Sequence, residues 1–248
     1  MLTLFRQALA FLTLLPVAPH QSPSESDLGK FPGLYPLVGL IIGLLTVLFF
    51  LLLKALGLAP QVAAVFLAVF QVFLTRGFHL DGLADCADAL LSHKTLEKKF
   101  EILKDSHLGT FGVTAVVVDI FLKIAFISFI FPLPAAPAVL LLYPVWGRLS
   151  ASVVAVRSQN ARLGPGLGFN MVEYSRPKDL ALALGSSALV SIFFGLSTFL
   201  TALLAALFGL FLVRVWKKTL GGVTGDLLGA SVELGEIAAL TFYFLWAL

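Results

Sequence analysis

Apolar residues in this chain form long, nearly unbroken runs instead of the short alternating or one-sided patterns of a soluble fold. A helix that crosses the hydrocarbon core of a bilayer needs about 20 mostly apolar residues. Runs of this length lie at 34–53, 55–75, 108–131, 136–156 and 227–248. A further apolar stretch at 180–213 is too long for one helix, and we expect two, broken near Gly195 and Ser197. The pattern predicts an all-α, polytopic membrane helix bundle with about seven transmembrane helices.

Two shorter segments are predicted to lie along the membrane surface. Residues 1–18 are apolar but contain Arg6 and lack the basic start of a signal peptide, so we expect an interfacial or re-entrant N-terminal helix. In 94–104, apolar residues recur at helical spacing between charged ones, which is typical of a cytoplasmic amphipathic helix on a membrane surface. We expect the whole chain, 1–248, to form a single integral membrane domain.

The composition supports a membrane protein and excludes several other classes. Of the 248 residues, 59% are hydrophobic and 12% are charged, and the mean hydropathy is +0.99. A soluble domain is about 45–50% apolar and about 25% charged. A water-soluble globule, a disordered chain and a nucleic-acid-binding domain are therefore excluded, and no nucleic-acid partner is expected. The single cysteine, Cys86, cannot form an internal disulfide, which excludes a disulfide scaffold.

Lysine and arginine residues are distributed unevenly about the predicted spans. If the spans alternate in direction, nearly all basic residues outside them fall on one side, and only Lys54 falls on the other. Treating 180–213 as one helix would move Arg214, Lys217 and Lys218 to the opposite side. Since basic loops stay in the cytoplasm, the sequence predicts a multi-pass protein of the cell membrane with its active site on the cytoplasmic face.

The strongest chemical signal is a set of three aspartates in the segment 76–88. Asp81, Asp85 and Asp88 are spaced i, i+4, i+7, so on a helix they lie on one stripe within about 60° of arc. No basic residue lies in the stripe to pair with them, and carboxylate oxygens are the ligands that Mg²⁺ or Mn²⁺ prefers. A solvated acidic helix face is the alternative. Three aspartates at the end of a span, without basic partners, favour a metal site with all three as ligands.

His79 precedes this stripe, and we consider it together with Asp88 as a candidate catalytic residue. Either side chain could orient or deprotonate an attacking hydroxyl group. An interfacial side chain without a chemical role is the alternative for His79. The spacing alone does not distinguish a metal ligand from a base among the aspartates.

Two glycine-rich helix starts are candidate phosphate-binding sites. Small residues at a helix start permit close backbone approach to an anion, and the helix dipole favours negative charge there. The candidate substrate-binding residues at the two starts are Lys104, Asp105, Ser106, Gly109 and Thr110, and then Thr224, Gly225 and Asp226. A helix start that is merely capped is the alternative for the first of them.

Ionisable residues within or beside the spans are further candidates for substrate binding. Arg148 lies in mid-span, Arg162 lies in a glycine-rich loop, and Glu233 lies two turns after the second helix start. Such groups inside a membrane are functional hypotheses by default, and arginine is suited to bidentate phosphate binding. Arg148 is expected to have a carboxylate partner that faces the bundle. Asp119 and Lys123, spaced i, i+4, can be interpreted as a pair that neutralises itself.

Together these groups are the components of metal-assisted phosphoryl transfer. They comprise carboxylates for a divalent cation, basic residues for phosphates and glycine-rich helix starts on one interface. The residues alone predict this reaction class, and they name neither the alcohol nor the nucleotide.

The segment His79–Asp88 resembles the His-Leu-Asp-Gly-Leu-Ala-Asp-x-x-Asp signature of the cobalamin synthase family, the adenosylcobinamide-GDP ribazoletransferases. Other segments resemble motifs of that family in the same order along the chain. They lie at 11–17, 35–39, 104–112 and 224–230. The chain departs from the family pattern at Leu14 and His107, where arginine is usual, and at Arg76, where glycine is common.

The resemblance implies a specific reaction and set of partners. A member of this family joins adenosylcobinamide-GDP to α-ribazole or its 5′-phosphate, with Mg²⁺ as the cofactor. The products are adenosylcobalamin or its 5′-phosphate, and GMP. The expected partners are therefore these small molecules and membrane lipid, and the sequence leaves open whether the chain forms a homo-oligomer.

Two alternatives from other classes fit the sequence less well. A CDP-alcohol phosphotransferase also has acidic helices, but its Asp-Gly-x-x-Ala-Arg pattern is not completed after Asp81 and Gly82. A cation-coupled transporter would have acids near mid-bilayer in paired repeats, whereas the sequence shows no internal repeat and most of its acids at one face.

Overall fold

The structure is a computed structural model that describes the chain except for residues 18, 20, 106, 162–165 and 248. Every regular element in the described part is a helix, and an isolated parallel bridge joins Asn160 to Val223. The all-α fold predicted from the sequence is confirmed.

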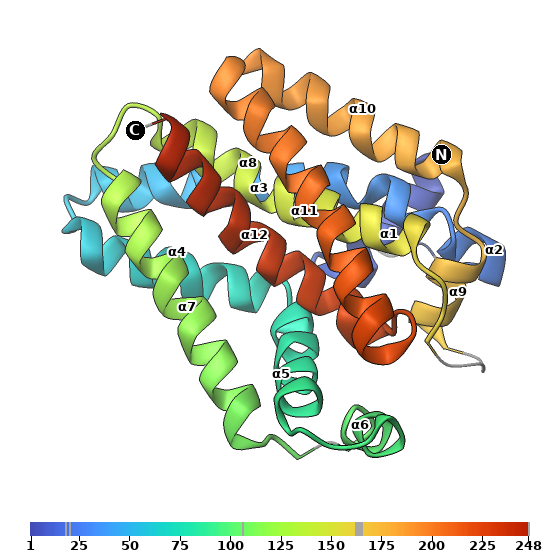
Figure 1. Cartoon of the computed structure of the whole chain (residues 1–248). Coiled ribbons are helices and arrows are strands. Elements are labelled where there is room, and N and C mark those ends of the chain that lie inside the picture. Colours follow the sequence, from blue (N-terminus) through green and yellow to red (C-terminus); the bar gives the residue numbers. More distant parts are fainter. Residues whose placement is uncertain (18, 20, 106, 162–165, 248) are drawn as a thin grey trace.

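Within the described residues, five helices are long and apolar enough to cross a membrane. They are α3 (Phe31–Ala55), α7 (Thr110–Ile130), α8 (Ala136–Arg157), α11 (Leu196–Leu220) and α12 (Gly225–Ala247). A helix suits this environment because it bonds its own backbone polar groups where no water can do so. The polytopic membrane bundle is therefore confirmed (Figure 1).

The number of such helices is lower than the seven or so expected because two of the predicted spans are short. α4 (Pro60–Leu74) has 15 residues and α10 (Pro177–Phe193) has 17. After α4 the chain bends by 90° into α5 (Phe78–Leu91), and counting this bent pair as one broken span gives six. The predicted span at 55–75 thus ends where α4 ends, and the aspartate segment forms a helix of its own.

The break expected in the stretch 180–213 is confirmed. α10 ends at Phe193 and α11 begins at Leu196. Gly195 lies between them with φ 116°, a conformation that side chains rarely adopt. The two helices therefore form an antiparallel pair, which keeps the basic end of α11 near the start of α12 (Figure 1).

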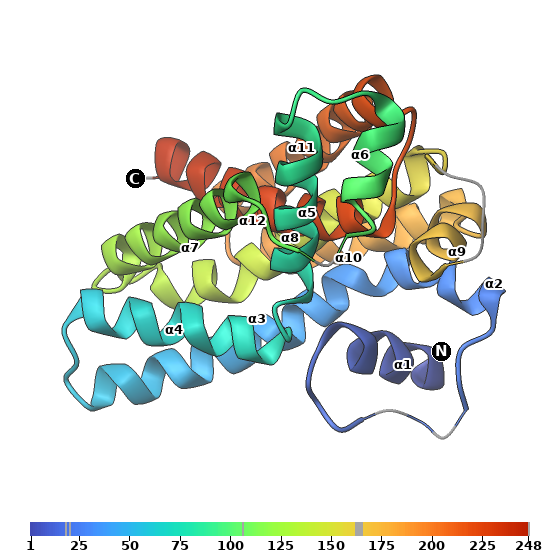
Figure 2. The same ribbon diagram turned by 90° about the horizontal axis from the view of Figure 1, so that it is seen from below.

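Four short helices complete the fold. They are α1 (Leu2–Leu12), α2 (Glu25–Leu28), α6 (Leu96–Ile102) and α9 (Leu167–Glu173). α1 packs against α3 through its buried residues Ala8, Leu9 and Leu12, and in Figure 2 it lies to one side of the long helices. α6 has no buried residue and lies beside the far end of α5. The predicted N-terminal and amphipathic helices are both present.

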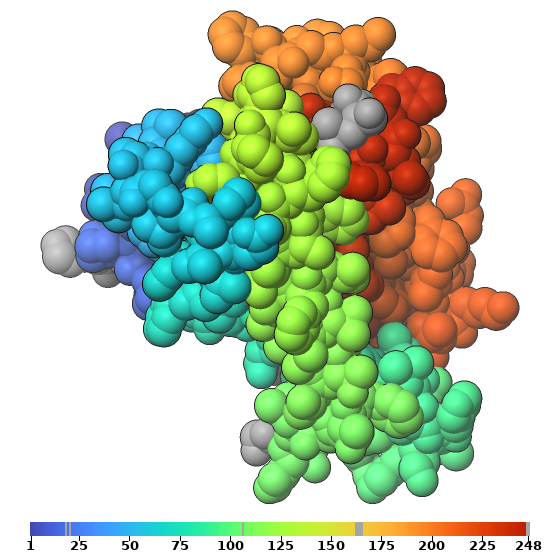
Figure 3. Space-filling model, turned by 90° about the vertical axis from the view of Figure 1, so that its left-hand side faces the viewer, coloured from blue at the N-terminus to red at the C-terminus, as the bar shows by residue number. Residues whose placement is uncertain are grey.

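The core of the bundle surrounds α8, which packs against α3, α10, α11 and α12. α3 approaches it closely because Gly39 and Gly43 have no side chains; a Cβ on Gly39 would come within 2.6 Å of the carbonyl oxygen of Pro144. In contrast, α7 lies on the outside, where Figure 3 shows it as a column between α4 and the α11–α12 pair. Its large side chains Val117 and Phe121 are exposed, as expected for a face that contacts lipid.

Candidate active site

The bend between α4 and α5 is made by two residues in the left-handed region of backbone conformation. Arg76 has φ 59° and Gly77 has φ 64°. Glycine adopts this conformation freely, whereas an arginine rarely does. The guanidinium of Arg76 donates hydrogen bonds to the carbonyl oxygens of Thr13 (3.0 Å) and Ala10 (3.4 Å). The N-terminal segment thus stabilises the bend that turns α5 away from α4.

Glycines bring α5 against the start of α12. A Cβ on Gly82 would come within 2.6 Å of the carbonyl oxygen of Asp226, and Gly229 faces the backbone of His79 and Gly82. The hydroxyl of Thr224 donates to the Asp226 carboxylate (3.2 Å) and accepts from the backbone N–H of Leu227 (3.4 Å). Thr224 therefore caps α12 and orients Asp226 beside α5.

The aspartates of α5 form an acidic ridge, which we define as Asp81, Asp85 and Asp88. Asp81 is exposed and the other two are half-buried. Asp85 interacts electrostatically with both of its ridge neighbours and with Asp226 of α12. Asp226, a candidate substrate-binding residue from the sequence, thus has its charge near the ridge.

The described residues contain no ready-made group of three or more His, Cys, Asp or Glu side chains that could hold a metal ion. The chemistry of the ridge nevertheless suits a divalent cation. Asp81 and Asp85 have no basic ion-pair partner in the described part of the chain, and their charges repel one another. A cation bridging them, with Asp226 beside them, would relieve this repulsion.

Asp88 has a structural partner that the sequence analysis did not predict. Its carboxylate accepts hydrogen bonds from the backbone N–H groups of Gly109 (2.7 Å) and Gly112 (2.9 Å), at the first turn of α7. A Cβ on either glycine would collide with this carboxylate. The glycines at this helix start thus permit close approach of the Asp88 carboxylate, which caps α7 at the place predicted for a phosphate.

The remaining predicted residues of this helix start are exposed. Lys104 and Thr110 are open to solvent, and Ser106 lies outside the described residues. The Asp105 carboxylate binds Nδ1 of His107 (2.6 Å) and accepts its backbone N–H (3.1 Å). These hydrogen bonds lower the pKa of Asp105 and raise the pKa of His107. At the position where the family pattern has arginine, the chain therefore has a histidine that favours its positively charged form.

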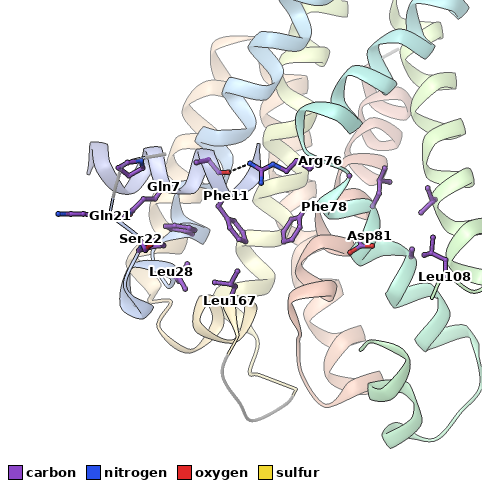
Figure 4. A pocket seen from close by; sticks show the side chains of 18 residues that line it. Gln7, Phe11, Gln21, Ser22, Leu28, Arg76, Phe78, Asp81, Leu108 and Leu167 are labelled. Carbon is purple, nitrogen blue, oxygen red and sulfur yellow. Dashed lines mark hydrogen bonds between the residues drawn. The ribbon is translucent and has the colours of Figure 1, made fainter. Parts of the chain in front are cut away.

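A cavity of about 1040 Å³ opens beside the ridge (Figure 4). Phe11 and Phe78 line it and contact each other edge to face, with ring centroids 5.3 Å apart. Gln7 and Gln21 line one end, and Asp81 lines the other. A cavity of this size, mostly apolar with a few polar groups, is typical of a site for a large organic ligand.

A second group of ionisable side chains, the buried charge cluster, lies where α7, α8 and α12 meet. The ammonium of Lys123 contacts carboxylate oxygens of Asp119 (3.0 Å), Glu236 (2.9 Å) and Glu233. Arg148 donates to the other oxygen of Glu236 (2.8 Å). Each of these residues is less than one-tenth exposed, so three carboxylates and two cations lie together inside the protein, where pairing offsets much of the cost of burying them.

Four residues of this cluster, Asp119, Lys123, Arg148 and Glu233, are also candidates from the sequence. The expected carboxylate partner of Arg148 is confirmed as Glu236. The expected pair of Asp119 and Lys123 is present, but Lys123 also contacts the two glutamates of α12. Arg148 and Glu233, both predicted to bind substrate, are 1% and 5% exposed. In this structure they are enclosed by protein groups.

His79 connects the cluster to the ridge. It is the second residue of α5 and is 3% exposed. Its Nδ1 lies 3.9 Å from Oε1 of Glu233 and has no hydrogen-bond partner among the described residues. His79 also lines a small cavity of about 40 Å³ together with Phe78 and Arg148.

The polar interior continues through residues that the sequence analysis did not single out. The hydroxyl of Tyr143 donates to Gln71, whose amide donates to the hydroxyl of Thr46 (2.9 Å). These side chains join α8, α4 and α3. An isolated polar residue within an apolar run is the signal that could have identified them. Arg162 cannot be placed in either group because it lies outside the described residues.

Comparison with known proteins relates the chain to one family. The family described as cobalamin-5-phosphate synthase matches residues 4–244. The chain is 36% identical over 239 residues to an adenosylcobinamide-GDP ribazoletransferase of Clostridium acetobutylicum, covering 96% of this chain and 92% of that protein. It is 37% identical over 238 residues to the protein of the same name from Caldanaerobacter subterraneus subsp. tengcongensis, covering 95% of each. No solved structure matches the chain.

Replacing Asp88 by alanine should lower the free energy of unfolding by about 1–2 kcal/mol, because α7 loses the carboxylate that caps it. Chemical unfolding in detergent, followed by circular dichroism, measures this change. Asp81→Ala is the matched control, since Asp81 is exposed and caps no helix; its effect should stay within about 0.5 kcal/mol. Equal stability of the two variants would show that the cap does not stabilise α7.

Replacing Lys123 by methionine should destabilise the bundle by about 3–5 kcal/mol, because the buried carboxylates around it lose their main cation. The same unfolding measurement, together with the yield of folded protein, tests this. Lys178→Met is the control, since Lys178 is exposed at the start of α10. A Lys123→Met protein as stable as the control would contradict the assignment of Lys123 as the central cation.

Proposed function

This chain belongs to the cobalamin-5-phosphate synthase family, and we propose that it catalyses the adenosylcobinamide-GDP ribazoletransferase reaction. In this reaction a hydroxyl oxygen of α-ribazole, or of its 5′-phosphate, forms a bond to the phosphorus next to cobinamide. The bond from that phosphorus to the bridging oxygen breaks, and GMP leaves. The hydroxyl proton passes to a base.

The observation that carries the proposal is the position of the acidic ridge at the rim of the large cavity. Asp81 belongs to both. A pyrophosphate-bearing donor needs a cation that compensates its negative charge next to space for an organic moiety. The carboxylates of the ridge would hold such a cation, and the cavity offers the space. The cavity walls, including Phe11 and Phe78, suit apolar and aromatic surfaces of the substrates.

Asp81, Asp85 and Asp226 are the residues that would hold a divalent cation. Bound there, Mg²⁺ or Mn²⁺ would neutralise the charge that develops on the departing phosphate. Asp88 was predicted as a further ligand, and one acceptor site on each of its oxygens is already used by α7. The main task that we assign to Asp88 is therefore to hold α7 against α5.

The reaction also needs a general base that accepts the proton of the attacking hydroxyl group. Asp88 and His79 are the two candidates. We favour His79, because Asp88 is engaged by two N–H groups, whereas Nδ1 of His79 has no hydrogen-bond partner in the described part of the chain. Glu233, 3.9 Å away, would stabilise the imidazolium that forms when His79 accepts the proton.

We further propose that this site faces the cytoplasm of a cell with the protein in its cell membrane. The ridge lies at the same end of the bundle as α6 and the basic C-terminal end of α11 (Figures 1 and 2). The positive-inside tendency of membrane proteins would orient that end toward the cytoplasm.

Replacing Asp85 by asparagine should lower turnover at least about a hundredfold, because the ridge loses a negative charge that would hold the cation against the pyrophosphate. The assay uses purified protein with adenosylcobinamide-GDP, α-ribazole and Mg²⁺, and measures GMP and the corrinoid product by mass spectrometry. Wild-type activity should disappear with EDTA and return with Mg²⁺ or Mn²⁺.

Glu97→Gln is the control for this experiment, because Glu97 is an exposed acid of α6 outside the ridge and cavity. It should retain wild-type turnover. Near-normal turnover of the Asp85→Asn protein at saturating Mg²⁺, or full activity in EDTA, would contradict the proposed role of the ridge.

A further inference from the structure

A separate cavity of about 260 Å³ lies between the C-terminal ends of α8 and α11. Arg157, the last residue of α8, and Ser158, which follows it, line the cavity on one side. Lys217 lines it from α11, and Gly222 lines it from the turn that precedes α12. It shares no lining residue with the cavity beside Asp81. None of the residues described as lining it is acidic.

Among the described residues, three polar groups of this basic pocket lack a protein partner that an ion pair or a hydroxyl hydrogen bond would supply. Neither Arg157 nor Lys217 forms an ion pair with any described residue. The hydroxyl oxygen of Ser158 is buried and has no hydrogen-bond partner in the described part of the chain. A buried hydroxyl without a partner costs free energy. A ligand with several acceptor oxygens would satisfy the hydroxyl and both cations.

We propose that this basic pocket binds a phosphate group. Two cations and a hydroxyl donor, with no acid among the described lining residues, are suited to an anion with several oxygens, and the arginine can bind it in a bidentate manner. The volume lies below the roughly 300–1,000 Å³ that drug-sized ligands occupy, so the pocket suits a phosphate group better than a whole nucleotide. Basic residues also complement helix C-terminal dipoles, but that role requires neither a cavity nor an unpartnered hydroxyl.

The pocket is connected by hydrogen bonds to the turn before α12. The backbone N–H of Val223 donates to the carbonyl oxygen of Gln159 (2.9 Å). The backbone N–H of Ala161 donates to the carbonyl oxygen of Val223 (3.0 Å). The side chain of Gln159 donates to the carbonyl oxygen of Gly221 (2.9 Å). A phosphate held by Arg157 and Lys217 would therefore fasten the ends of α8 and α11 to this turn.

Two sources could supply the phosphate group: the headgroup of an anionic lipid at the membrane surface and a soluble phosphate. The inference does not rest on the proposed function, because it concerns binding by residues outside the ridge and the large cavity. A failed binding test would leave the transferase proposal intact, and a failed activity test would leave the pocket intact.

The experiment measures binding to the purified, full-length protein in two arms. In the first, native mass spectrometry compares the affinities for phosphatidylglycerol and phosphatidylcholine. In the second, calorimetry measures the affinity for inorganic phosphate. The proteins are the wild type, the double variant Arg157→Gln/Lys217→Gln, and Ser158→Ala. Lys218→Gln is the matched control, because Lys218 is the exposed neighbour of Lys217 and does not line the pocket.

The double variant should bind at least one of the two phosphate probes at least about tenfold more weakly, and Ser158→Ala about threefold or more, while the control matches the wild type. Weakening with phosphatidylglycerol alone identifies a lipid headgroup, and weakening with inorganic phosphate identifies a soluble ligand. The proposal is overturned if the double variant binds both probes like the wild type, or if Lys218→Gln weakens binding equally. Unfolding midpoints of all variants check that each protein is folded.

Discussion

The bundle depends on one buried cation, the ammonium of Lys123, on which three carboxylates converge. Ionised carboxylates in an apolar interior are very unfavourable unless they are paired. Lys123 therefore joins α7 to α12, and Arg148 joins α8 to the same helix through Glu236. These contacts fix the rotation of α12 about its axis. Its N-terminal end then presents Asp226 and Gly229 to α5.

The carboxylates of the acidic ridge are in a different environment from those of the buried charge cluster. The cluster is enclosed, and its acids have lysine and arginine partners. The ridge lies at the rim of a large cavity, and Asp81 and Asp85 have no basic partner among the described residues. Acidic residues thus have two roles in this protein. Inside the bundle they stabilise the packing of helices, and at the rim we assign them the binding of a cation that would in turn bind a pyrophosphate.

Much of the fold could be predicted from hydrophobic runs, because a membrane restricts a spanning segment to a helix of known length. The interruption at Gly195 was visible in the length of the apolar stretch. The i, i+4, i+7 spacing likewise placed Asp81, Asp85 and Asp88 on one helix, and the rarity of intramembrane arginine indicated a carboxylate partner for Arg148. The break and the aspartate stripe depend only on residues close together in the sequence. The partner of Arg148 follows from the high free energy of an unpaired charge in lipid.

Features that depend on contacts between distant segments could not be predicted in the same way. Asp88 caps α7 from another helix, and the glycines that permit this resemble those of a phosphate-binding helix start. The left-handed conformation of Arg76 depends on carbonyl groups of the N-terminal segment. The approach of Asp226 to the ridge depends on packing at Gly82. Neither spacing nor composition encodes these distances.

The central claim is that the acidic ridge binds a divalent cation, and titration with Mn²⁺ followed by electron paramagnetic resonance tests it most directly. The measurement compares the wild type with the double variant Asp81→Asn/Asp85→Asn, in the presence of the nucleotide donor. The account predicts a bound Mn²⁺ signal in the wild type that is displaced by Mg²⁺ and absent from the double variant. Bound Mn²⁺ that is unchanged by the two substitutions, or no bound Mn²⁺ in the wild type, would contradict it.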